Sequence, residues 1–496
     1  MKRSDLRRFQ VIFANKIKRL PSVILALSMG GGKTVATLTA LVDLLDDRKI
    51  KKVLVIAPLN VARVTWSDEI NEWDHTRDLT YTILRAEDYD EDVQQWYRDR
   101  YEGFKLLGNN AIEAGKLARK SMIRFKERKR IRLASEDTEI HIINREAIPW
   151  LWDFFGEGKR WPYDAIVTDE SSMYKNGKMR TPKKQLTRFG VVAKARKYTK
   201  KMIQLTGTPA PKGLINLWGQ AYIADGGERL GTSKFKYEQL YFDKDHMGWN
   251  LEPKAFAFNK IMGKMEDIMF SLPPELYPEC PPYTPVIRKV SLHPRLMEQY
   301  YEFQKSLFAR EWSIEAVNKG VLHNKLLQFA NGSLYDENKK AHFVHDEKLF
   351  ELENLVDEAN GDPLLVAYTF EFDRHRIKKH FGKRVVVWGE GPIKRTKDAW
   401  NAGDIEILLA HGNSIGHGQN IQQGGNIFCW YGLTSDLEIY QQFNKRLDRP
   451  GQTKPVFGHH IVAEGTLDEE LLPILANRDS DQNDILRAVQ IRINRD

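Results

Sequence analysis

The sequence contains little cysteine and no long apolar run. Its two cysteines among 496 residues, Cys280 and Cys429, are far apart and have no partner at metal-ligand spacing. This scarcity argues against a disulfide framework and against a zinc ribbon. No stretch approaches the ~20 consecutive apolar residues that a membrane-spanning helix requires, and residues 6–10 lack the apolar character of a secretion signal. We therefore expect a soluble intracellular protein with no membrane partner.

Internal repeats and low-complexity tracts are also missing. Apolar residues make up 42% of the chain and aromatic residues 11%, which is enough to fill ordinary globular cores. The formal net charge of +9 suggests a polyanionic partner. Because many basic proteins bind no nucleic acid, the charge alone leaves both interpretations open.

Two groups of short, nearly continuous apolar segments alternate with helical patterns. The first group comprises residues 23–27, 52–57, 140–144, 165–168 and 201–206, and the second comprises 363–368, 384–388, 405–410 and 426–430. Such strands, separated by helices, are typical of parallel sheets covered on both faces. We therefore predict an α/β fold with two doubly wound parallel-sheet lobes.

Composition divides the predicted fold further. Residues 226–290 are rich in glycine, proline and aromatic residues, which favours an irregular connector. We predict an N-terminal lobe over residues 1–225, this connector over 226–290, a helical start of the second lobe over 291–359, a C-terminal lobe over 360–470 and a charged helical tail over 471–496.

A strongly basic segment interrupts the first lobe. Between residues 116 and 132, nine basic residues accompany a single acid, Glu127, with apolar residues interleaved. One interpretation is a solvated helix face. The other is a phosphate-contacting helix within a helical insertion over residues 90–135, which would use Arg124 and Lys126.

The strongest local signal is a glycine-rich segment between a predicted strand and a predicted helix. Residues 28–34 read Ser-Met-Gly-Gly-Gly-Lys-Thr. A phosphate chain needs a loop whose backbone N–H groups can converge on it, and glycine leaves room for that approach. The residues that we expect to bind the phosphates are Met29, Gly30, Gly31, Gly32, Lys33 and Thr34. Lys33 would reach the terminal phosphates, and the Thr34 hydroxyl would bind magnesium. The strict pattern has glycine where Leu27 stands, and the alternative is a glycine-rich turn before an ordinary helix.

Two adjacent acids end another predicted strand. Asp169 and Glu170 follow the apolar residues 165–168. Asp169 would hold magnesium, and Glu170 would orient or deprotonate the attacking water. Adjacent acids at a strand end are common on surfaces, so the pair alone is moderate evidence for a catalytic site. Its occurrence together with the glycine-rich segment makes that interpretation stronger.

Two arginines lie near the end of the second predicted lobe. Arg446 and Arg449 are three residues apart, so on a helix they would share a face. The planar guanidinium suits phosphate oxygens, and an arginine supplied by another lobe typically accelerates hydrolysis by about 10³–10⁵. A surface helix with two arginines is the alternative when the segment is taken by itself.

Taken in order, these segments resemble superfamily-2 helicases, and most closely the Swi/Snf-type translocases. The resemblance extends over residues 6–462 and is carried by residues 6–10, 28–34, 55–58, 66–73, 169–170, 205–209, 322–331, 414–420 and 442–452. Ser172 stands where the family has a histidine after its acid pair, which puts the coupling role of that histidine in doubt.

The resemblance implies two RecA-like lobes with ATP and magnesium in the cleft between them. It implies that Gln10 contacts the adenine and that Gly416 and Gly418 approach phosphate or DNA. The implied activity is an ATP-dependent motor that steps along duplex DNA, and the compact chain favours a phage or bacterial protein of the cytoplasm. We expect a monomer, with a protein partner as a possible targeting factor.

The DNA track is predicted less directly than the ATP site. The candidate DNA contacts are Pro58, Arg63, Arg124, Lys126, Lys175, Thr206, Asn413 and Gln442. By composition alone, the segment 205–209 that contains Thr206 is an ordinary strand-to-loop turn.

Three other functions remain open at this point. The same engine serves single-strand DNA or RNA helicases. An ATPase-dead DNA-binding scaffold is disfavoured by the intact Lys33, Asp169 and Glu170. A motor subunit of a nuclease complex would need a partner, since the two lobes and the connector occupy nearly the whole chain.

Overall fold

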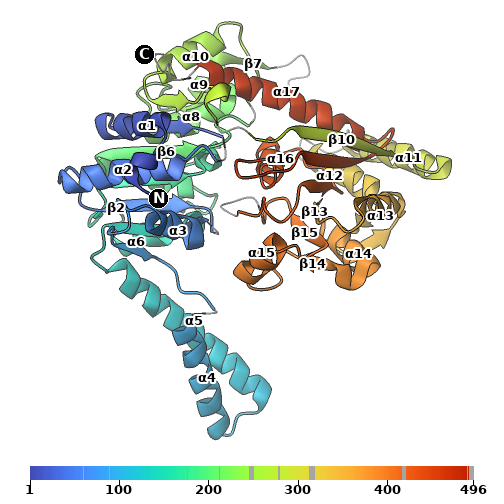
Figure 1. Ribbon diagram of the computed structural model, residues 1–496, viewed down its shortest axis with the longest axis horizontal. Helices are drawn as coiled ribbons and strands as arrows, with labels where there is room; N and C mark the ends of the chain where they lie inside the picture. The colour runs from blue at the N-terminus through green and yellow to red at the C-terminus, as the bar shows by residue number, and fades with distance from the viewer. Residues whose placement is uncertain are drawn as a thin grey trace.

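The computed structural model describes residues 1–28, 30–59, 61–88, 90–175, 177–211, 213–244, 251–277, 280–311, 319–415, 420–488 and 490. Its described part contains two large parallel sheets, each the centre of one lobe (Figure 1). This confirms the predicted α/β class with two parallel-sheet lobes. No helix of the described part is long and apolar enough to cross a membrane.

The first sheet has the strand order β3-β4-β2-β5-β6-β1-β9 within the described residues, with every neighbouring pair parallel. Its strands are β1 (Ser22–Ala26), β2 (Val53–Ala57), β3 (Tyr81–Ile83), β4 (Ile140–Asn144), β5 (Ala165–Asp169), β6 (Lys201–Thr206) and β9 (Met269–Ser271). The helices around it are α1 (Arg8–Arg19), α2 (Lys33–Asp46), α3 (Trp66–Glu72), α6 (Ile148–Phe154), α7 (Arg188–Ala195) and α8 (Leu217–Asp225).

Alternate strand residues of this sheet enter two separate cores. Ile24 and Leu54 belong to the core on one face, whereas Leu25 and Val53 belong to the core on the other. Because both faces are covered, the central strands are buried along their whole length, which explains their continuous apolar character. The carboxyl ends of these parallel strands therefore meet at one edge of the sheet, where ligands bind in such folds.

The second sheet has the order β10-β17-β16-β13-β15-β14 within the described residues and is also parallel throughout. Its strands are β10 (Tyr283–Val290), β13 (Leu364–Tyr368), β14 (Val385–Val387), β15 (Ile407–His411), β16 (Ile427–Trp430) and β17 (Val456–Ala463). Its helices are α11 (Pro294–Glu311), α12 (Lys319–Ala330), α13 (Glu347–Ala359), α14 (Glu371–Phe381), α15 (Ile393–Asn401), α16 (Leu437–Asn444) and α17 (Leu467–Ala488). A small antiparallel pair, β11 (Ser333–Tyr335) and β12 (Ala341–Phe343), lies outside the sheet.

The segment over residues 226–290 differs from the irregular connector that we expected. It contains α9 (Lys234–Tyr241), α10 (Ala257–Met265) and the antiparallel pair β7 (Phe242–Lys244) and β8 (Leu251–Pro253). Its strand β9 pairs with β1 of the first sheet, and β10 pairs with β17 of the second. The segment thus completes both sheets, and its proline clusters occupy only the stretch between β9 and β10.

The basic segment forms one arm of a helical hairpin. Helices α4 (Glu91–Leu106) and α5 (Ala111–Ala134) pack against each other and project away from the first lobe (Figure 1). Trp96 stacks on Phe125 with ring centroids 4.6 Å apart and donates from Nε1 to Ser121 Oγ over 3.1 Å. At the base of the hairpin, the Arg130 guanidinium lies 3.6 Å from the ring centroid of Trp150.

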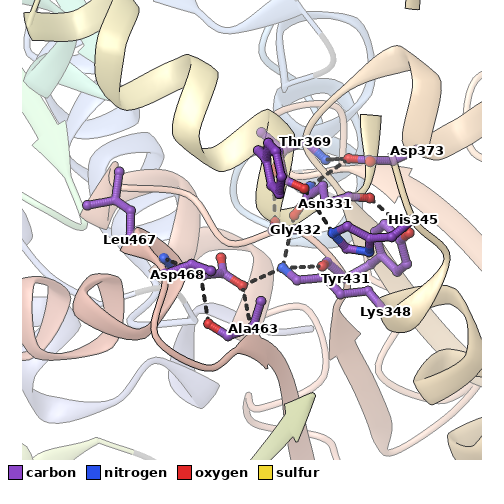
Figure 2. A network of polar contacts seen from close by, with 12 residues as sticks. Asn331, His345, Lys348, Thr369, Asp373, Tyr431, Gly432, Ala463, Leu467 and Asp468 are labelled. Carbon is purple, nitrogen blue, oxygen red and sulfur yellow. Dashed lines mark hydrogen bonds and ion pairs between the residues drawn. The ribbon is translucent and has the colours of Figure 1, made fainter. Parts of the chain in front are cut away.

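Helix α17 connects the two lobes (Figure 1). It follows β17 of the second sheet, and near its end the backbone carbonyl of Leu486 accepts a hydrogen bond from Ser271 Oγ at β9 of the first sheet. A buried polar network holds its beginning, as Figure 2 shows. Fully buried Lys348 forms an ion pair with Asp468 of α17 and donates to Asn331 Oδ1 over 2.9 Å and to the Tyr431 carbonyl over 3.3 Å.

Candidate active site

The glycine-rich loop joins the carboxyl end of β1 to the beginning of α2. Gly30 and Gly32 adopt positive φ angles of 76° and 67°, which L side chains rarely tolerate. A Cβ on Gly32 would lie 2.1 Å from Gln10 Nε2, so the loop has no room for a side chain there. The loop thus has the bare backbone and the helix N-terminus that a phosphate chain requires. Met29 lies outside the described residues.

Lys33 is the first residue of α2 and points back into the loop. Its Nζ donates to the Leu27 carbonyl over 2.7 Å and to the Ser28 carbonyl over 3.3 Å. Burial lowers the pKa of the Lys33 ammonium, while the nearby carboxylates of Glu170 and Asp169 oppose this decrease. A phosphate group at this place would stabilise the buried cation.

The two predicted acids lie together at the end of β5. Asp169 Oδ2 accepts a hydrogen bond from Trp66 Nε1 over 3.1 Å, and Asp169 Oδ1 accepts one from the Glu170 backbone N–H over 3.1 Å. These two hydrogen bonds fix the orientation of the Asp169 carboxylate. Glu170 adopts a positive φ of 57°. A non-glycine residue in this left-handed region is uncommon and is characteristic of functional sites.

Burial changes the acid–base properties of both carboxyls. It raises the pKa of Asp169, with Lys33 acting in the opposite direction. It raises the pKa of Glu170 to about 8, and the neighbouring carboxylates of Glu438 and Asp169 add to this increase. A carboxyl whose pKa lies near physiological pH is suited to accept a proton in catalysis.

The two arginines reach the same place from the second lobe. They do not share a helix face as predicted, because α16 ends at Asn444 and both follow in the turns after it. Arg446 is nevertheless only 2% exposed and donates from Nε to the Gln442 carbonyl over 3.0 Å. Burial lowers the pKa of both arginines, because it removes the hydration that stabilises the charged guanidinium.

A cleft between the lobes collects these groups. Its volume is about 310 Å³, which is within the usual range of about 300–1,000 Å³ for ligand sites. The first lobe contributes Gly30, Gly31, Gly32, Lys33, Thr34, Asp169 and Glu170, and the second contributes Lys397, Asn420, Arg446 and Arg449. Pro450 of the second lobe lies so close to the loop that a Cβ on Gly30 would be 3.0 Å from its Cδ. The cleft is therefore a composite of both lobes.

The donor set fits a magnesium ion. Mg²⁺ prefers hard oxygen ligands and usually keeps several waters and substrate phosphates in its shell. The Thr34 hydroxyl and the Asp169 carboxylate supply such oxygens beside the phosphate-binding loop. Among the described residues, no cluster of three or more His, Cys, Asp or Glu residues that could hold a metal ion is found.

Gln10 lies next to the glycine-rich loop, where the resemblance placed it. Its Oε1 accepts a hydrogen bond from the Arg7 backbone N–H over 2.8 Å, and its amide nitrogen faces Gly32. A contact with adenine stays a prediction. Gly416 and Gly418 lie outside the described residues.

The candidate DNA contacts fall into different environments. Arg124 and Asn413 are exposed. Three others face carboxylates: Arg63 pairs with Glu87 at 2.5 Å, Lys126 with Asp88 at 2.6 Å and Lys175 with Glu438 at 3.6 Å. The remaining candidates are buried, and these are Pro58, Thr206 and Gln442.

Thr206 is buried in this conformation, and its contact with DNA stays a prediction. Its hydroxyl accepts a hydrogen bond from the Thr208 backbone N–H over 3.1 Å, and its carbonyl accepts one from the Leu27 N–H. Thr206 therefore holds the end of β6 against the beginning of the glycine-rich loop. It is buried because it lies inside a sheet that is covered on both faces.

Several residues at the site were not predicted. Tyr277 Oη accepts a hydrogen bond from the Ser28 backbone N–H over 2.9 Å. Ser172, the replacement for the family histidine, donates from Oγ to Glu438 Oε1 of the second lobe over 2.5 Å. Nothing in the sequence pattern of Tyr277 or Glu438 distinguishes them from ordinary surface residues.

Fold and cleft together define a two-lobed α/β protein with a phosphate-binding type of loop at the interface between its lobes. Residues 9–221 match the family model of the SNF2-related domain. The chain is 32% identical over 503 residues to putative protein p41 of Acyrthosiphon pisum secondary endosymbiont phage 1, covering 99% of this chain and 100% of that protein. The chain belongs to the SNF2-related family.

Two solved structures with a similar fold are SWI2/SNF2 ATPase cores of Sulfolobus solfataricus. The core in complex with dsDNA has a TM-score of 0.41 and 19% identity, covering 98% of this chain and 97% of that chain. The core domain has a TM-score of 0.38 and 18% identity, covering 97% of this chain and 90% of that chain.

Proposed function

We propose that this protein is an ATP-dependent translocase that hydrolyses ATP between its two lobes and steps along duplex DNA. One observation carries the proposal: the glycine-rich loop and acid pair of the first lobe face Arg446 and Arg449 of the second across one cleft. A site of this kind is complete only while the lobes are together. Hydrolysis is thereby linked to relative motion of the lobes.

The residues of the first lobe bind ATP and activate the attacking water. Lys33 and the backbone N–H groups of the glycine-rich loop hold the terminal phosphates of ATP. Thr34 and Asp169 would hold magnesium, which supplies charge neutralisation on the phosphate oxygens when bound. Glu170 orients the attacking water and accepts its proton, which its pKa of about 8 allows at physiological pH.

The residues of the second lobe complete the charge balance. Arg446 and Arg449 bind the phosphate oxygens, where negative charge is concentrated during transfer. Loss of the terminal phosphate removes the anion that holds these arginines against the first lobe. The lobes then separate, and each cycle of closure and opening moves the position at which each lobe binds the DNA.

The track that we propose is duplex DNA. The net charge of +9 and the exposed basic face of α5 support a polyanionic partner. Membership in the SNF2-related family supports duplex DNA over single strands. A single-strand DNA or RNA helicase would use the same cleft and is separated from this proposal by experiment.

The test compares ATP turnover by the full chain without nucleic acid and with duplex DNA, single-stranded DNA or RNA. Lys33→Ala serves as the control for contaminating ATPases. We expect strong stimulation by duplex DNA that the variant loses, together with ATP-dependent displacement of a third strand from duplex DNA. Stimulation by single strands or RNA alone would contradict the proposal that the track is duplex DNA. Absence of turnover under every condition would contradict the proposal that the protein hydrolyses ATP.

A further inference from the structure

The turn between α4 and α5 exposes three large aliphatic side chains, which we call the tip. Leu106 is the last residue of α4 and Leu107 its C-cap, and they are 88% and 78% exposed. Ile112, in the first turn of α5, is 74% exposed. The tip lies at the end of the hairpin that projects from the first lobe (Figure 1). Single exposed aliphatic residues are ordinary, whereas a group of them in one place is characteristic of an interaction site.

The hairpin does not need the tip for its own packing. Its buried residues include Val93, Ala114 and Ala118. The stacked rings of Trp96 and Phe125 join the two helices. Polar side chains would therefore serve the turn equally well, and the stability of the hairpin does not explain why the tip is aliphatic.

Hydrogen bonds fix the turn that carries the tip. Asn110 is the N-cap of α5, and its side chain accepts a hydrogen bond from the Glu113 backbone N–H over 3.0 Å. Asn109 Nδ2 donates to the Phe104 carbonyl over 2.9 Å. Gly108 has a positive φ of 89°, which lets the chain leave α4 sharply. The three aliphatic side chains are thus held in defined positions, which lowers the entropic cost of inserting them into a partner.

The surface next to the tip is basic. Residues 103–120 contain four basic residues and one acid, and all five side chains are exposed: Lys105, Glu113, Lys116, Arg119 and Lys120. A partner of the tip therefore has to combine an apolar face with neighbouring negative charge. Stacked base pairs between two phosphate backbones have both properties.

The basic surface also continues along α5, away from the tip. Exposed Arg124 and Arg128 follow Ile112 by about 18 and 24 Å along the helix, at 1.5 Å per residue. An anionic membrane that met the tip end-on would attract basic residues only within a Debye length of about 8–10 Å. A duplex that lies alongside the hairpin can place phosphates near the whole basic surface. The distribution of charge therefore favours duplex DNA as the partner.

We propose that the tip is a wedge that inserts its aliphatic side chains between stacked base pairs, while the exposed basic residues of α5 bind the adjacent phosphates. The proposal rests on duplex DNA as the track and adds the element that distorts it. Leucine and isoleucine are among the residues that DNA-bending proteins insert in this way, and insertion partly unstacks one base step and kinks the duplex. Because unstacking costs free energy, the wedge prefers a step that is already weakly stacked.

The test observes the base step directly, with the full chain and without ATP. The probe is a short duplex with one central mismatch beside 2-aminopurine, a fluorescent base that brightens when it unstacks. The tip variant is Leu106→Ala, Leu107→Ala, Ile112→Ala, and a conservative variant has methionine at the same three positions. The matched control is Ile123→Ala, Ile131→Ala, which truncates exposed aliphatic residues of the same helix away from the tip. Thermal unfolding shows first that each variant folds.

We expect the unaltered protein at saturation to raise the fluorescence several-fold. It should also bind the mismatched duplex roughly tenfold more tightly than the fully paired one, because the mismatch has already lost part of its stacking. The tip variant should lose both effects and keep the salt dependence of binding, since it retains every phosphate-binding side chain. The methionine variant should retain both effects, because methionine also serves as a wedge. The control should match the unaltered protein.

A fluorescence increase that survives in the tip variant would contradict the wedge, and so would its loss in the methionine variant. Tip-dependent binding to anionic lipid vesicles, or tip-dependent dimerisation in sedimentation, without a fluorescence change on DNA would overturn the wedge in favour of a membrane or a second copy of the chain.

The wedge and the proposed translocase fail in different measurements. A fluorescence increase that requires the tip, combined with ATP turnover that duplex DNA does not stimulate, would support the wedge and contradict only the translocase. Stimulated turnover without a fluorescence change would contradict only the wedge. Absence of duplex binding by the unaltered chain would contradict both.

Discussion

Glu170 combines burial, a positive φ angle and four neighbouring carboxyl and cationic groups, so its protonation should be visible in the kinetics. Its pKa is raised to about 8 in the free protein. Because the base acts in its ionised form and kcat/KM reports the free enzyme, we expect kcat/KM for ATP to rise with pH through about 8. Glu170→Gln should abolish turnover while ATP still binds.

The same shift has a consequence for stability with a definite sign. A carboxyl with a raised pKa in the folded state contributes stability below its unfolded pKa and loses it as pH rises through its folded pKa. Glu170→Gln cannot ionise, so its melting temperature relative to the unaltered protein should increase as pH rises from the ordinary glutamate pKa of 4.5 towards about 8 and should level off at higher pH. A pH-independent difference between the two proteins, measured without ATP, would refute the raised pKa.

Arg449 tests the composite nature of the cleft at the scale of one residue. Arg449→Ala should lower kcat by about 10³–10⁵, as expected for an arginine supplied from another lobe. Arg449→Lys should not restore it, since an ammonium cannot bind two phosphate oxygens as the planar guanidinium does. Lys445→Ala is the matched control, because Lys445 pairs locally with Asp448 at 2.6 Å. Full turnover in Arg449→Ala would show that the site is not shared between lobes.

At the scale of elements, the α4–α5 hairpin separates two kinds of basic residue that the sequence could not distinguish. Lys126 and Lys129 form ion pairs with aspartates at the base of the hairpin. Lys120, Arg124 and Arg128 are exposed on the outer face of α5. The nine basic residues of the segment are therefore not equivalent candidates for binding phosphate.

We expect the exposed set to bind DNA. The triple variant Lys120→Ala, Arg124→Ala, Arg128→Ala should weaken duplex binding and lower the slope of log K against log salt by roughly 0.9 per lost phosphate contact. The double variant Lys126→Ala, Lys129→Ala should instead lower the melting temperature and leave that slope nearly unchanged. Equal slopes for the triple variant and the unaltered protein would remove α5 from the DNA-binding surface.

Most of the fold could be predicted from elements with a strong pattern. Strands such as β2 and β13 are apolar throughout because both faces of their sheets are covered, and this pattern is visible in the sequence. Strand β9 has three residues and pairs with the distant strand β1, so its membership in the first sheet could not be foreseen. Local patterns carry no information on such long-range pairing.

The candidate site divides in the same way. Lys33, Asp169 and Glu170 follow buried strands, and the fold brings strand ends together, so their proximity followed from the sequence. The end of α16 at Asn444 and the position of Glu438 opposite Ser172 depend on how the two lobes meet. That relation between lobes is a property of the whole molecule, which no segment of the sequence specifies by itself.

At the scale of the whole molecule, helix α17 links the two lobes. It continues the chain of the second lobe, and its far end contacts the first lobe. Its beginning depends on the buried pair of Lys348 and Asp468, whose side chains are 0% and 1% exposed (Figure 2). Asn331 also accepts a hydrogen bond from Lys348 and donates to Asp373 Oδ2 over 3.0 Å. A buried ion pair of this kind stabilises less than its Coulomb energy suggests, but removal of one partner leaves an uncompensated charge.

We therefore expect Lys348→Met to lower the free energy of unfolding by about 3–5 kcal/mol, measured by urea denaturation. The double variant Lys348→Met, Asp468→Leu should recover most of this loss, because it leaves no unpaired charge. If α17 transmits motion between lobes, the single variant should also reduce duplex-stimulated turnover more than basal turnover, since its loosened start weakens the link to the first lobe. A double variant as unstable as the single one would show that the polar network, and not charge pairing, holds α17 in place.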